Sequence, residues 1–293
     1  MTDNKYETYY VPAQSRWPIV GAIAMFLLAF GAGTLMNDLR TGTPGMGKWI
    51  VYAGLAIVLY FTWGWFKDQI NESMGGLFSK QLGMSYRQGM MWFIGSEVMF
   101  FAGFFGALYY ARNFAMPWLA GEGNNAMTHA LLWPDFIPSW PLIKTPSGTV
   151  TEAMQPWGLP FINTVLLVSS SFTLTWAHHA LIAGNRKKLI GGMLLTVALG
   201  VAFLFLQASE YHEAYTEMGL TLGSGIYGST FFMLTGFHGM HVTLGTIMLI
   251  VMTVRSGKGH FSADKHFAFE AAAWYWHFVD VVWLGLFLFV YIL

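Results

Sequence analysis

The chain has 293 residues, of which 55% are hydrophobic and only 10% are charged, and its formal net charge at pH 7 is zero. A soluble domain carries roughly 25% charged residues, so this composition excludes an ordinary soluble fold and favours a protein embedded in a bilayer. The balanced charge removes the case for a nucleic-acid-binding protein. The absence of cysteine excludes disulfides, thiolate metal sites, iron–sulfur clusters and cysteine nucleophiles.

Seven apolar runs are long enough to cross a membrane as α-helices, which takes about 20 mostly apolar residues. In chain order they are, approximately, Trp17–Met36, Trp49–Phe66, Gly89–Ala111, Trp157–Ile182, Leu189–Ser209, Ile226–Val254 and Phe267–Leu293. The first run is too long for a signal-peptide core, and no persuasive cleavage site follows it. The sequence therefore predicts one all-α membrane domain, residues 1–293, with seven transmembrane helices and a retained first helix.

The basic residues all fall between the apolar runs, and they divide unevenly between the two sides of the membrane. The side of the N-terminus holds eleven: Lys5, Arg16, Lys67, Lys80, Arg87, Arg186, Lys187, Lys188, Arg255, Lys258 and Lys265. The opposite side holds four: Arg40, Lys48, Arg112 and Lys144. Because cytoplasmic loops collect Lys and Arg, we predict the N-terminus inside and the C-terminus outside.

Two connections between the expected helices are long. Residues 113–155 lie on the predicted outer side, are rich in Pro and Gly and show no clear periodicity. We expect this outer loop to pack over the outer rim of the helices or against a partner. The inner connection, residues 67–88, separates the first two spans from the remaining five.

Glu97 is the only charged residue in the third span, and aromatic residues flank it. A carboxylate at the bilayer centre costs roughly 2.5–3.5 kcal/mol on insertion scales, and desolvation favours the protonated acid. Two interpretations remain open. Glu97 is either a neutral, hydrogen-bonded structural residue or a group linked to proton movement.

The sixth and seventh spans carry the other buried polar groups. His238 and His241 are three residues apart, on adjoining positions of one helix face. Glu270, His277 and Asp280 recur at intervals of seven and three residues and form one stripe that should face the bundle interior. Histidines and carboxylates without a thiolate or a third convergent histidine are a weak metal signal. We therefore predict a hydrogen-bonded patch between these two spans rather than haem or metal ligation.

Several segments, taken together, resemble subunit III of the haem–copper cytochrome c oxidases. They are residues 65–68 (WFKD), 96–101 (SEVMFF), 176–179 (WAHH), 207–211 (QASEY), 225–232 (GIYGSTFF), 235–242 (TGFHGMHV) and 269–284 (FEAAAWYWHFVDVVWL). The last block is the most specific. The resemblance covers essentially all seven spans and is weakest in the first span and in residues 113–155.

This resemblance implies a non-redox core subunit of an aa3-type oxidase, which reduces dioxygen to water and pumps protons. It places haem a, haem a3 and CuB in subunit I and CuA in subunit II, with cytochrome c as electron donor and no cofactor or catalytic centre in this chain. Subunit I is the implied main partner, with subunit II also in the complex. The first two helices (about 17–66) would splay from the other five (about 89–293) and leave a cleft for structural phospholipids.

The resemblance also implies roles for particular residues. The subunit would stabilise subunit I, support proton uptake and protect the complex from inactivation during turnover. Glu97 resembles the family's membrane-embedded glutamate and is expected to be protonated at neutral pH. Glu72, Arg87 and Arg255 are candidates for lipid headgroup contacts, although Asn71 stands where relatives can carry an arginine. The long outer loop is typical of bacterial chains, which implies a bacterial cytoplasmic (inner) membrane.

Three alternatives fit parts of the pattern. Subunit III of a quinol oxidase has the same fold, but such chains typically lack the first two helices. A haem-bearing membrane anchor needs paired histidines on facing helices. A small-solute transporter needs repeat symmetry and broken helices near the midplane, which the sequence does not display.

Overall fold

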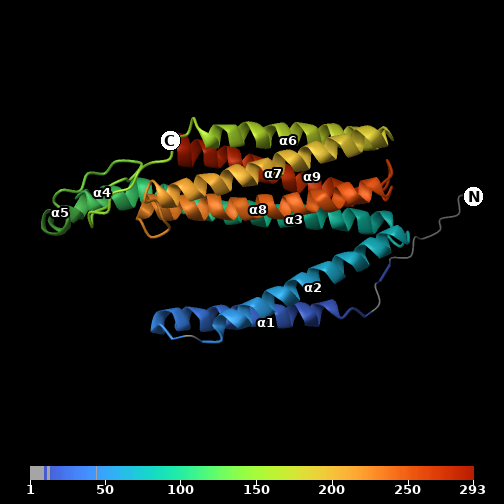
Figure 1. The fold of residues 1–293 in the computed structure, drawn as a ribbon, viewed down its shortest axis with the longest axis horizontal. Helices are drawn as coiled ribbons and strands as arrows, with labels where there is room; N and C mark the ends of the chain where they lie inside the picture. The colour runs from blue at the N-terminus through green and yellow to red at the C-terminus, as the bar shows by residue number, and fades with distance from the viewer. Residues whose placement is uncertain (1–9, 12–13, 44) are drawn as a thin grey trace, which may run out of the picture. The chain divides into compact units, whose positions relative to one another are not determined.

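The computed structural model describes residues 10–11, 14–43 and 45–293, and within them the protein is all-α (Figure 1). Seven helices are long and apolar enough to cross a membrane, which confirms the predicted number of spans in this part of the chain. They are α1 (Trp17–Thr41), α2 (Gly47–Met74), α3 (Lys80–Tyr110) with its continuation to Leu132, α6 (Leu159–Ile182), α7 (Arg186–Thr216), α8 (Ile226–Gly257) and α9 (Phe267–Leu286) with its continuation η3 (Phe287–Ile292). Lys5, which entered the prediction of orientation, lies outside the described residues.

The third helix extends well beyond its predicted end. It passes through a π-helical turn, η1 (Ala111–Ala115), into α4 (Met116–Leu119), η2 (Gly123–Asn125) and α5 (Ala126–Leu132). The first part of residues 113–155 is thus helical, although no periodicity was visible there. Alternating π, α and 3₁₀ turns change the number of residues per turn, so the 3.6-residue pattern that identifies a helix is lost.

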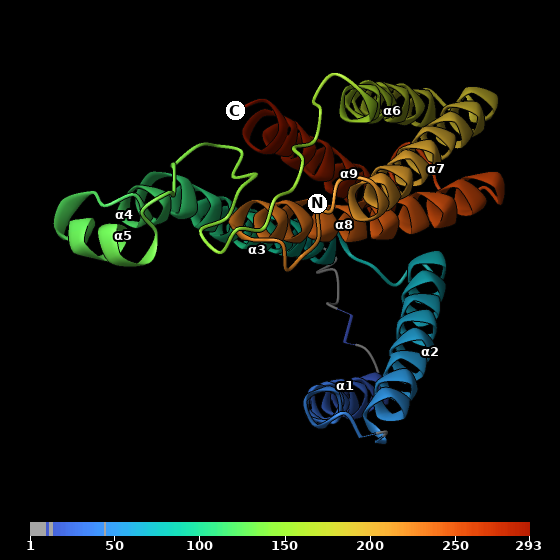
Figure 2. The same ribbon diagram turned by 60° about the vertical axis from the view of Figure 1, so that its left-hand side comes forward.

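The remainder of this segment packs on one end of the bundle. Leu142 and Met154 are buried in the core. The backbone N–H of Met154 donates to the Tyr227 hydroxyl at 3.1 Å, and the Trp140 ring lies 5.5 Å from that of Tyr227. Figure 2 shows the chain between α5 and α6 crossing the end of the bundle at which the C-terminus lies.

Contacts divide the chain into two compact units, residues 1–86 and 87–293, and the division falls inside the predicted inner connection 67–88. Unit 1 is the hairpin of α1 and α2. Its helices approach closely because Gly31 and Gly54 leave room for the facing backbone. At one end of the hairpin the Trp17 indole donates to Asp68 Oδ2 at 2.7 Å, and at the other Asp38 Oδ2 accepts the backbone N–H of Gly47 at 3.0 Å.

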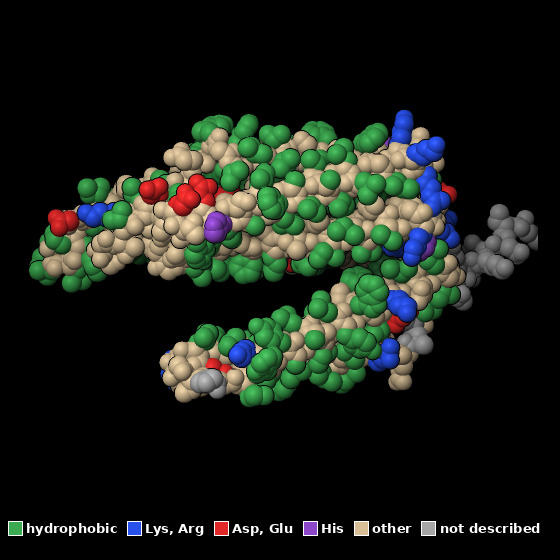
Figure 3. Space-filling model, in the orientation of Figure 1, with side chains coloured by type: hydrophobic (Ala, Val, Ile, Leu, Met, Phe, Trp, Pro, Cys, Tyr) green, Lys and Arg blue, Asp and Glu red, His purple; other side chains and the backbone are tan. Residues whose placement is uncertain are grey.

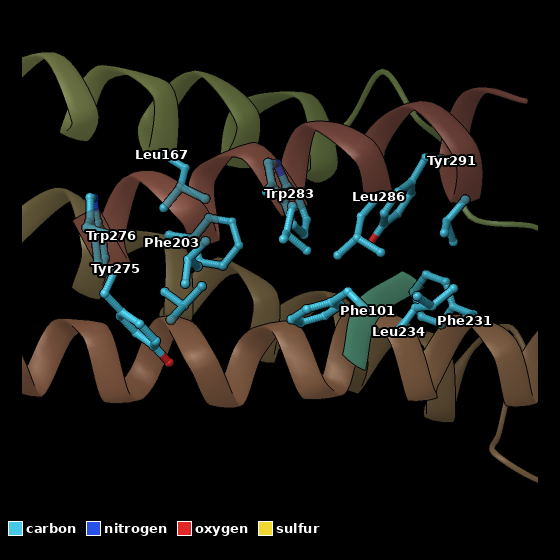
Figure 4. Packing of buried hydrophobic residues seen from close by; sticks show 14 of the residues in the cluster. Phe101, Leu167, Phe203, Phe231, Leu234, Tyr275, Trp276, Trp283, Leu286 and Tyr291 are labelled. Atoms are coloured by element: carbon cyan, nitrogen blue, oxygen red, sulfur yellow. The ribbon is translucent and has the colours of Figure 1, made fainter. Parts of the chain in front are cut away.

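Unit 2 is built around α9, whose two buried tryptophans pack against α6, α7 and α8 (Figure 4). Trp276 and Trp283 are fully buried, and their indole N–H groups donate to Ser170 Oγ at 2.8 Å and Thr164 Oγ1 at 2.9 Å. Gly200 lies against the Trp276 ring, where a larger residue would collide. The core therefore combines large aromatic volume with satisfied indole donors, which fixes the rotation of α9.

Candidate functional site

The intramembrane acid Glu97 on α3 is paired with a histidine on α8. Glu97 Oε2 lies 2.8 Å from His241 Nε2, and the two side chains are 21% and 7% exposed. His241 Nδ1 lies 2.6 Å from the Phe237 carbonyl oxygen. Because a carbonyl oxygen can only accept, Nδ1 carries a proton. The contact at Nε2 then needs one more proton, on either the acid or the imidazole. The pair is therefore neutral as a whole in both arrangements.

His238, one turn before His241, serves packing between α8 and α9. It is 1% exposed, and its Nε2 donates to the Val279 carbonyl oxygen at 3.1 Å. Its ring contacts those of Phe203 and Trp283, with centroid distances of 5.7 and 5.1 Å. In the part of the chain that the structure describes, no group of three or more His, Asp or Glu side chains is arranged to hold a metal ion.

Glu270, at the beginning of α9, forms an ion pair with α3. Its Oε2 lies 2.9 Å from Arg87 Nη2 and 3.3 Å from Arg87 Nε. The guanidinium also lies over the Phe267 ring, 5.5 Å from the centroid. Arg87 is 45% exposed and Glu270 is 19% exposed. Glu270 is therefore neutralised within the chain, and Arg87 has a protein partner in addition to any lipid.

His277 and Asp280 form a short hydrogen-bonded chain with α6. His277 Nδ1 lies 3.1 Å from Ser171 Oγ, and Asp280 bonds the same hydroxyl. On its other side, His277 Nε2 lies 3.5 Å from Thr175 Oγ1. A single hydroxyl thus links a carboxyl group to an imidazole.

The five polar residues singled out on the sixth and seventh spans therefore do not form one patch between these two spans, and that prediction is wrong in its partners. Of these residues, His238 joins the two helices by a hydrogen bond to a backbone carbonyl, and the His241 ring stacks against Tyr275 of α9 at a centroid distance of 6.4 Å. Glu97 pairs with His241, Glu270 pairs with α3, and His277 and Asp280 face α6. Positions seven residues apart on a straight helix are rotated by about 20° and lie about two turns apart along its axis. Residues in one stripe can therefore reach different neighbours.

The two other residues expected at lipid headgroups lie at helix ends. Glu72, near the end of α2 in unit 1, accepts hydrogen bonds from Gln69 at 3.3 Å and from Tyr10. Arg255, near the end of α8, is 7% exposed and lies 4.6 Å above the Phe261 ring. Its Nε is buried without a partner, and none of the described carboxylates forms an ion pair with it.

The loop after α8 adds a histidine and a link to the neighbouring connection. Burial, followed by the positive charges of Arg255 and Lys258, lowers the pKa of His260, so this imidazole is neutral at pH 7. The Arg186 guanidinium, at the start of α7, donates to the Gly257 carbonyl oxygen. The basic residues of these two connections therefore share one end of unit 2 (Figure 3).

One buried acid was missed in the sequence. Glu210 on α7 is 1% exposed, and its Oε1 accepts from the Tyr291 hydroxyl at 2.7 Å. Glu210 lies just beyond the predicted fifth span, Leu189–Ser209. Glu210 nevertheless follows Gly200, Phe203 and Gln207 at helical spacing, and all three are buried. That spacing was the available signal.

Comparison with known proteins gives a consistent result over nearly the whole chain. The family model for "Cytochrome c oxidase subunit III" matches residues 7–121 and 125–293. The chain is 40% identical over 284 residues to "Cytochrome c oxidase subunit 3" of Hippopotamus amphibius, covering 97% of this chain and 96% of the relative. It is 40% identical over 291 residues to the protein of the same name from Latimeria chalumnae, with the same coverage. It is 37% identical over 292 residues to that of Arabidopsis thaliana, covering 99% and 98%.

Proposed function

This chain belongs to the cytochrome c oxidase subunit III family, and from that premise we propose that it is the non-redox core subunit of an aa3-type oxidase. It is a multi-pass membrane protein and a member of the oxidase complex, which implies subunits I and II as partners. In the proposal, subunit I is the main contact and cytochrome c is the donor to the complex. Haem a, haem a3 and CuB are held by subunit I and CuA by subunit II.

The proposed role is to stabilise subunit I, support its proton uptake and slow its inactivation during turnover. The observation that carries it is the neutral pair of Glu97 and His241, 2.8 Å apart. This pair lets α3 carry an acid inside its span without a net charge, and it ties that helix to α8. A subunit that stabilises its neighbour has to present a contact helix whose position is fixed, and the pair fixes α3 against α8. The outward apolar face of α3 includes Trp92 and Met99, which are 74% and 71% exposed.

Phospholipid binding is the second part of the proposal. Arg255 is the strongest headgroup candidate, because its guanidinium is almost buried and has no carboxylate partner among the described residues. Arg87 is weaker, since Glu270 already neutralises it. Glu72 would contact the amine of a zwitterionic lipid. In the proposed arrangement α1 and α2 splay from the other spans, and the lipids fill the cleft.

The proposed orientation places the N-terminus in the cytoplasm and the C-terminus outside, in a bacterial cytoplasmic membrane. The eleven-to-four distribution of basic residues supports it. Protease cleavage of sealed vesicles of known sidedness tests it. A site introduced in residues 258–265 should be cut only when the cytoplasmic face is accessible, and cleavage from the opposite face would reverse the orientation.

Purification of the complex through a tag on this subunit tests the function. The complex should contain haem a, accept electrons from cytochrome c rather than quinol, and consume oxygen. A preparation depleted of this subunit should begin at a similar rate and lose activity faster during turnover. Equal lifetimes with and without the subunit would contradict the protective role, and a preference for quinol would assign the chain to the other branch of the superfamily.

A further inference from the structure

Four glutamates line a pocket of about 300 Å³ at the end of unit 2 where α7 finishes: Glu152, Glu210, Glu213 and Glu217. The last three recur at intervals of three and four residues and so share one face of α7. Glu152 belongs to the segment that leads into α6, and its backbone N–H donates to the Met218 carbonyl oxygen at 3.1 Å. Figure 3 shows acidic side chains gathered at this end of unit 2 and basic side chains at the opposite end.

The negative charge of this pocket is not balanced within the described residues. No Lys or Arg is among the residues that line it, and none forms an ion pair with its four carboxylates. The carboxyl end of α7 adds the partial negative charge of its unsatisfied carbonyl groups, and its last turn has no basic residue. Acids at this end of a helix repel the dipole and one another, so the arrangement favours a cation from outside the chain.

Glu210 gives an independent indication that something enters the pocket. Its side chain lines the pocket yet is 1% exposed, and only Oε1 has a partner, the Tyr291 hydroxyl. Oε2 is buried without a hydrogen-bond partner. Buried carboxylate oxygens are nearly always satisfied in folded proteins. A donor that reached the inner end of the pocket would satisfy this atom.

We propose that this pocket receives the lysine or arginine side chain of a neighbouring polypeptide of the complex. The volume exceeds that of a single ion, and Met218, Leu159 and Pro160 provide an apolar wall for the methylene stem of such a side chain. Glu213, Glu217 and Glu152 are exposed and form the rim, and Glu210 forms the buried end. The described acids are not arranged to coordinate a metal ion directly. The proposal rests on membership of a multi-subunit complex and on none of the roles proposed above.

Because this subunit contains no cysteine, a single introduced thiol reports on the pocket in the purified complex. Gln155 lines the pocket and is exposed, so Gln155→Cys is the reporter. Leu222→Cys, half exposed and outside the pocket lining, is the matched control. The rates of reaction with a cationic and an anionic methanethiosulfonate reagent are followed from the mass of this subunit. The readout is labelling, so the result does not depend on which oxidase activity the complex has.

The expected result is slow labelling of Gln155→Cys at low salt by both reagents. Raising the salt to about 1 M, which shortens the Debye length to about 3 Å, should speed it at least about tenfold. Adding Glu213→Gln and Glu217→Gln should have the same effect at low salt. Rapid low-salt labelling, fastest with the cationic reagent, would show an empty acidic pocket and overturn the proposal. If labelling is slow and neither salt nor the two substitutions change its rate, the pocket is only sterically blocked. If a metal chelator speeds the labelling, the pocket holds a metal ion. Either result also overturns the proposal.

Discussion

Glu97 on α3 and His241 on α8 lie 2.8 Å apart and share one proton, because the other ring nitrogen of His241 is committed to a backbone carbonyl. The acid that looked isolated in the sequence is thus half of a neutral pair. Its side chain is still 21% exposed at the surface of the isolated chain. The carboxyl group is therefore neutralised by its partner but remains accessible from the membrane.

Glu97 should react with a hydrophobic carbodiimide in intact membranes. The reagent attacks a protonated carboxyl, and proton exchange within the pair supplies that form at the lipid-facing surface. Mass spectrometry of this subunit measures the labelled position. Glu97→Gln is the control and should show no labelling in that peptide. The absence of labelling in the unsubstituted protein would contradict a protonated, lipid-accessible acid.

Removing the histidine should be more harmful than neutralising the acid. In Glu97→Gln the side-chain amide N–H can still donate a hydrogen bond to His241 Nε2. The subunit should therefore remain assembled, and its free energy of unfolding should fall by less than about 1 kcal/mol. His241→Phe leaves the carboxyl group without its partner and should cost about 1–3 kcal/mol. The temperature at which the subunit is released from the detergent-purified complex compares the two variants. Greater loss from Glu97→Gln would mean that the ionised acid is required.

Gly200 should tolerate no side chain, because α9 approaches α7 there. A Cβ at this position would lie 2.8 Å from the buried Trp276 ring, which cannot move while its indole donates to Ser170. Gly200→Ala should therefore cost about 1–3 kcal/mol through overpacking. Gly191→Ala, on the same helix with open space around it, should be neutral or slightly stabilising. Thermal denaturation of the two variants measures the difference, and equal midpoints would contradict the close packing.

The ion pair between Arg87 and Glu270 should contribute little to stability, since Arg87 is 45% exposed. Exposed pairs are worth about 0.2–1 kcal/mol, so Arg87→Ala and Glu270→Ala should each have small effects on thermal unfolding. The double variant should lose less than the sum of the two single losses. A strictly additive double-mutant cycle would show that the two side chains do not interact.

Arg255→Ala should remove a bound phospholipid from the complex. Its almost buried guanidinium lacks a carboxylate partner among the described residues, so an anionic phosphate is the expected counter-charge. Native mass spectrometry or phosphorus analysis measures the number of lipids retained. Lys258→Ala, on an exposed residue three positions later, is the control and should retain them. Unchanged lipid content in Arg255→Ala would remove this residue from the proposed lipid site.

Parts of the structure could be predicted because their signals are local. The apolar runs identified the seven spans found among the described residues, since length and composition alone decide whether a helix can cross a bilayer. Of the six polar residues expected inside the spans, His238, His241 and Asp280 are buried, whereas Glu97, Glu270 and His277 are partly exposed. The helical start of residues 113–155 was missed because π and 3₁₀ turns at Ala111–Ala115 and Gly123–Asn125 interrupt the period.

The sequence by itself determined that this is a seven-helix membrane protein with a few acids and histidines inside its spans. Only the tertiary structure decided which groups meet. Glu97 pairs with a histidine 144 positions away, Glu270 with an arginine 183 positions away, and Glu210 with Tyr291. Helical spacing places residues on a face of their own helix. Which neighbouring helix that face contacts depends on the rotation of the helix about its axis and on its position along that axis in the bundle. In this protein the packing of Trp276 and Trp283 against the other helices sets both for α9.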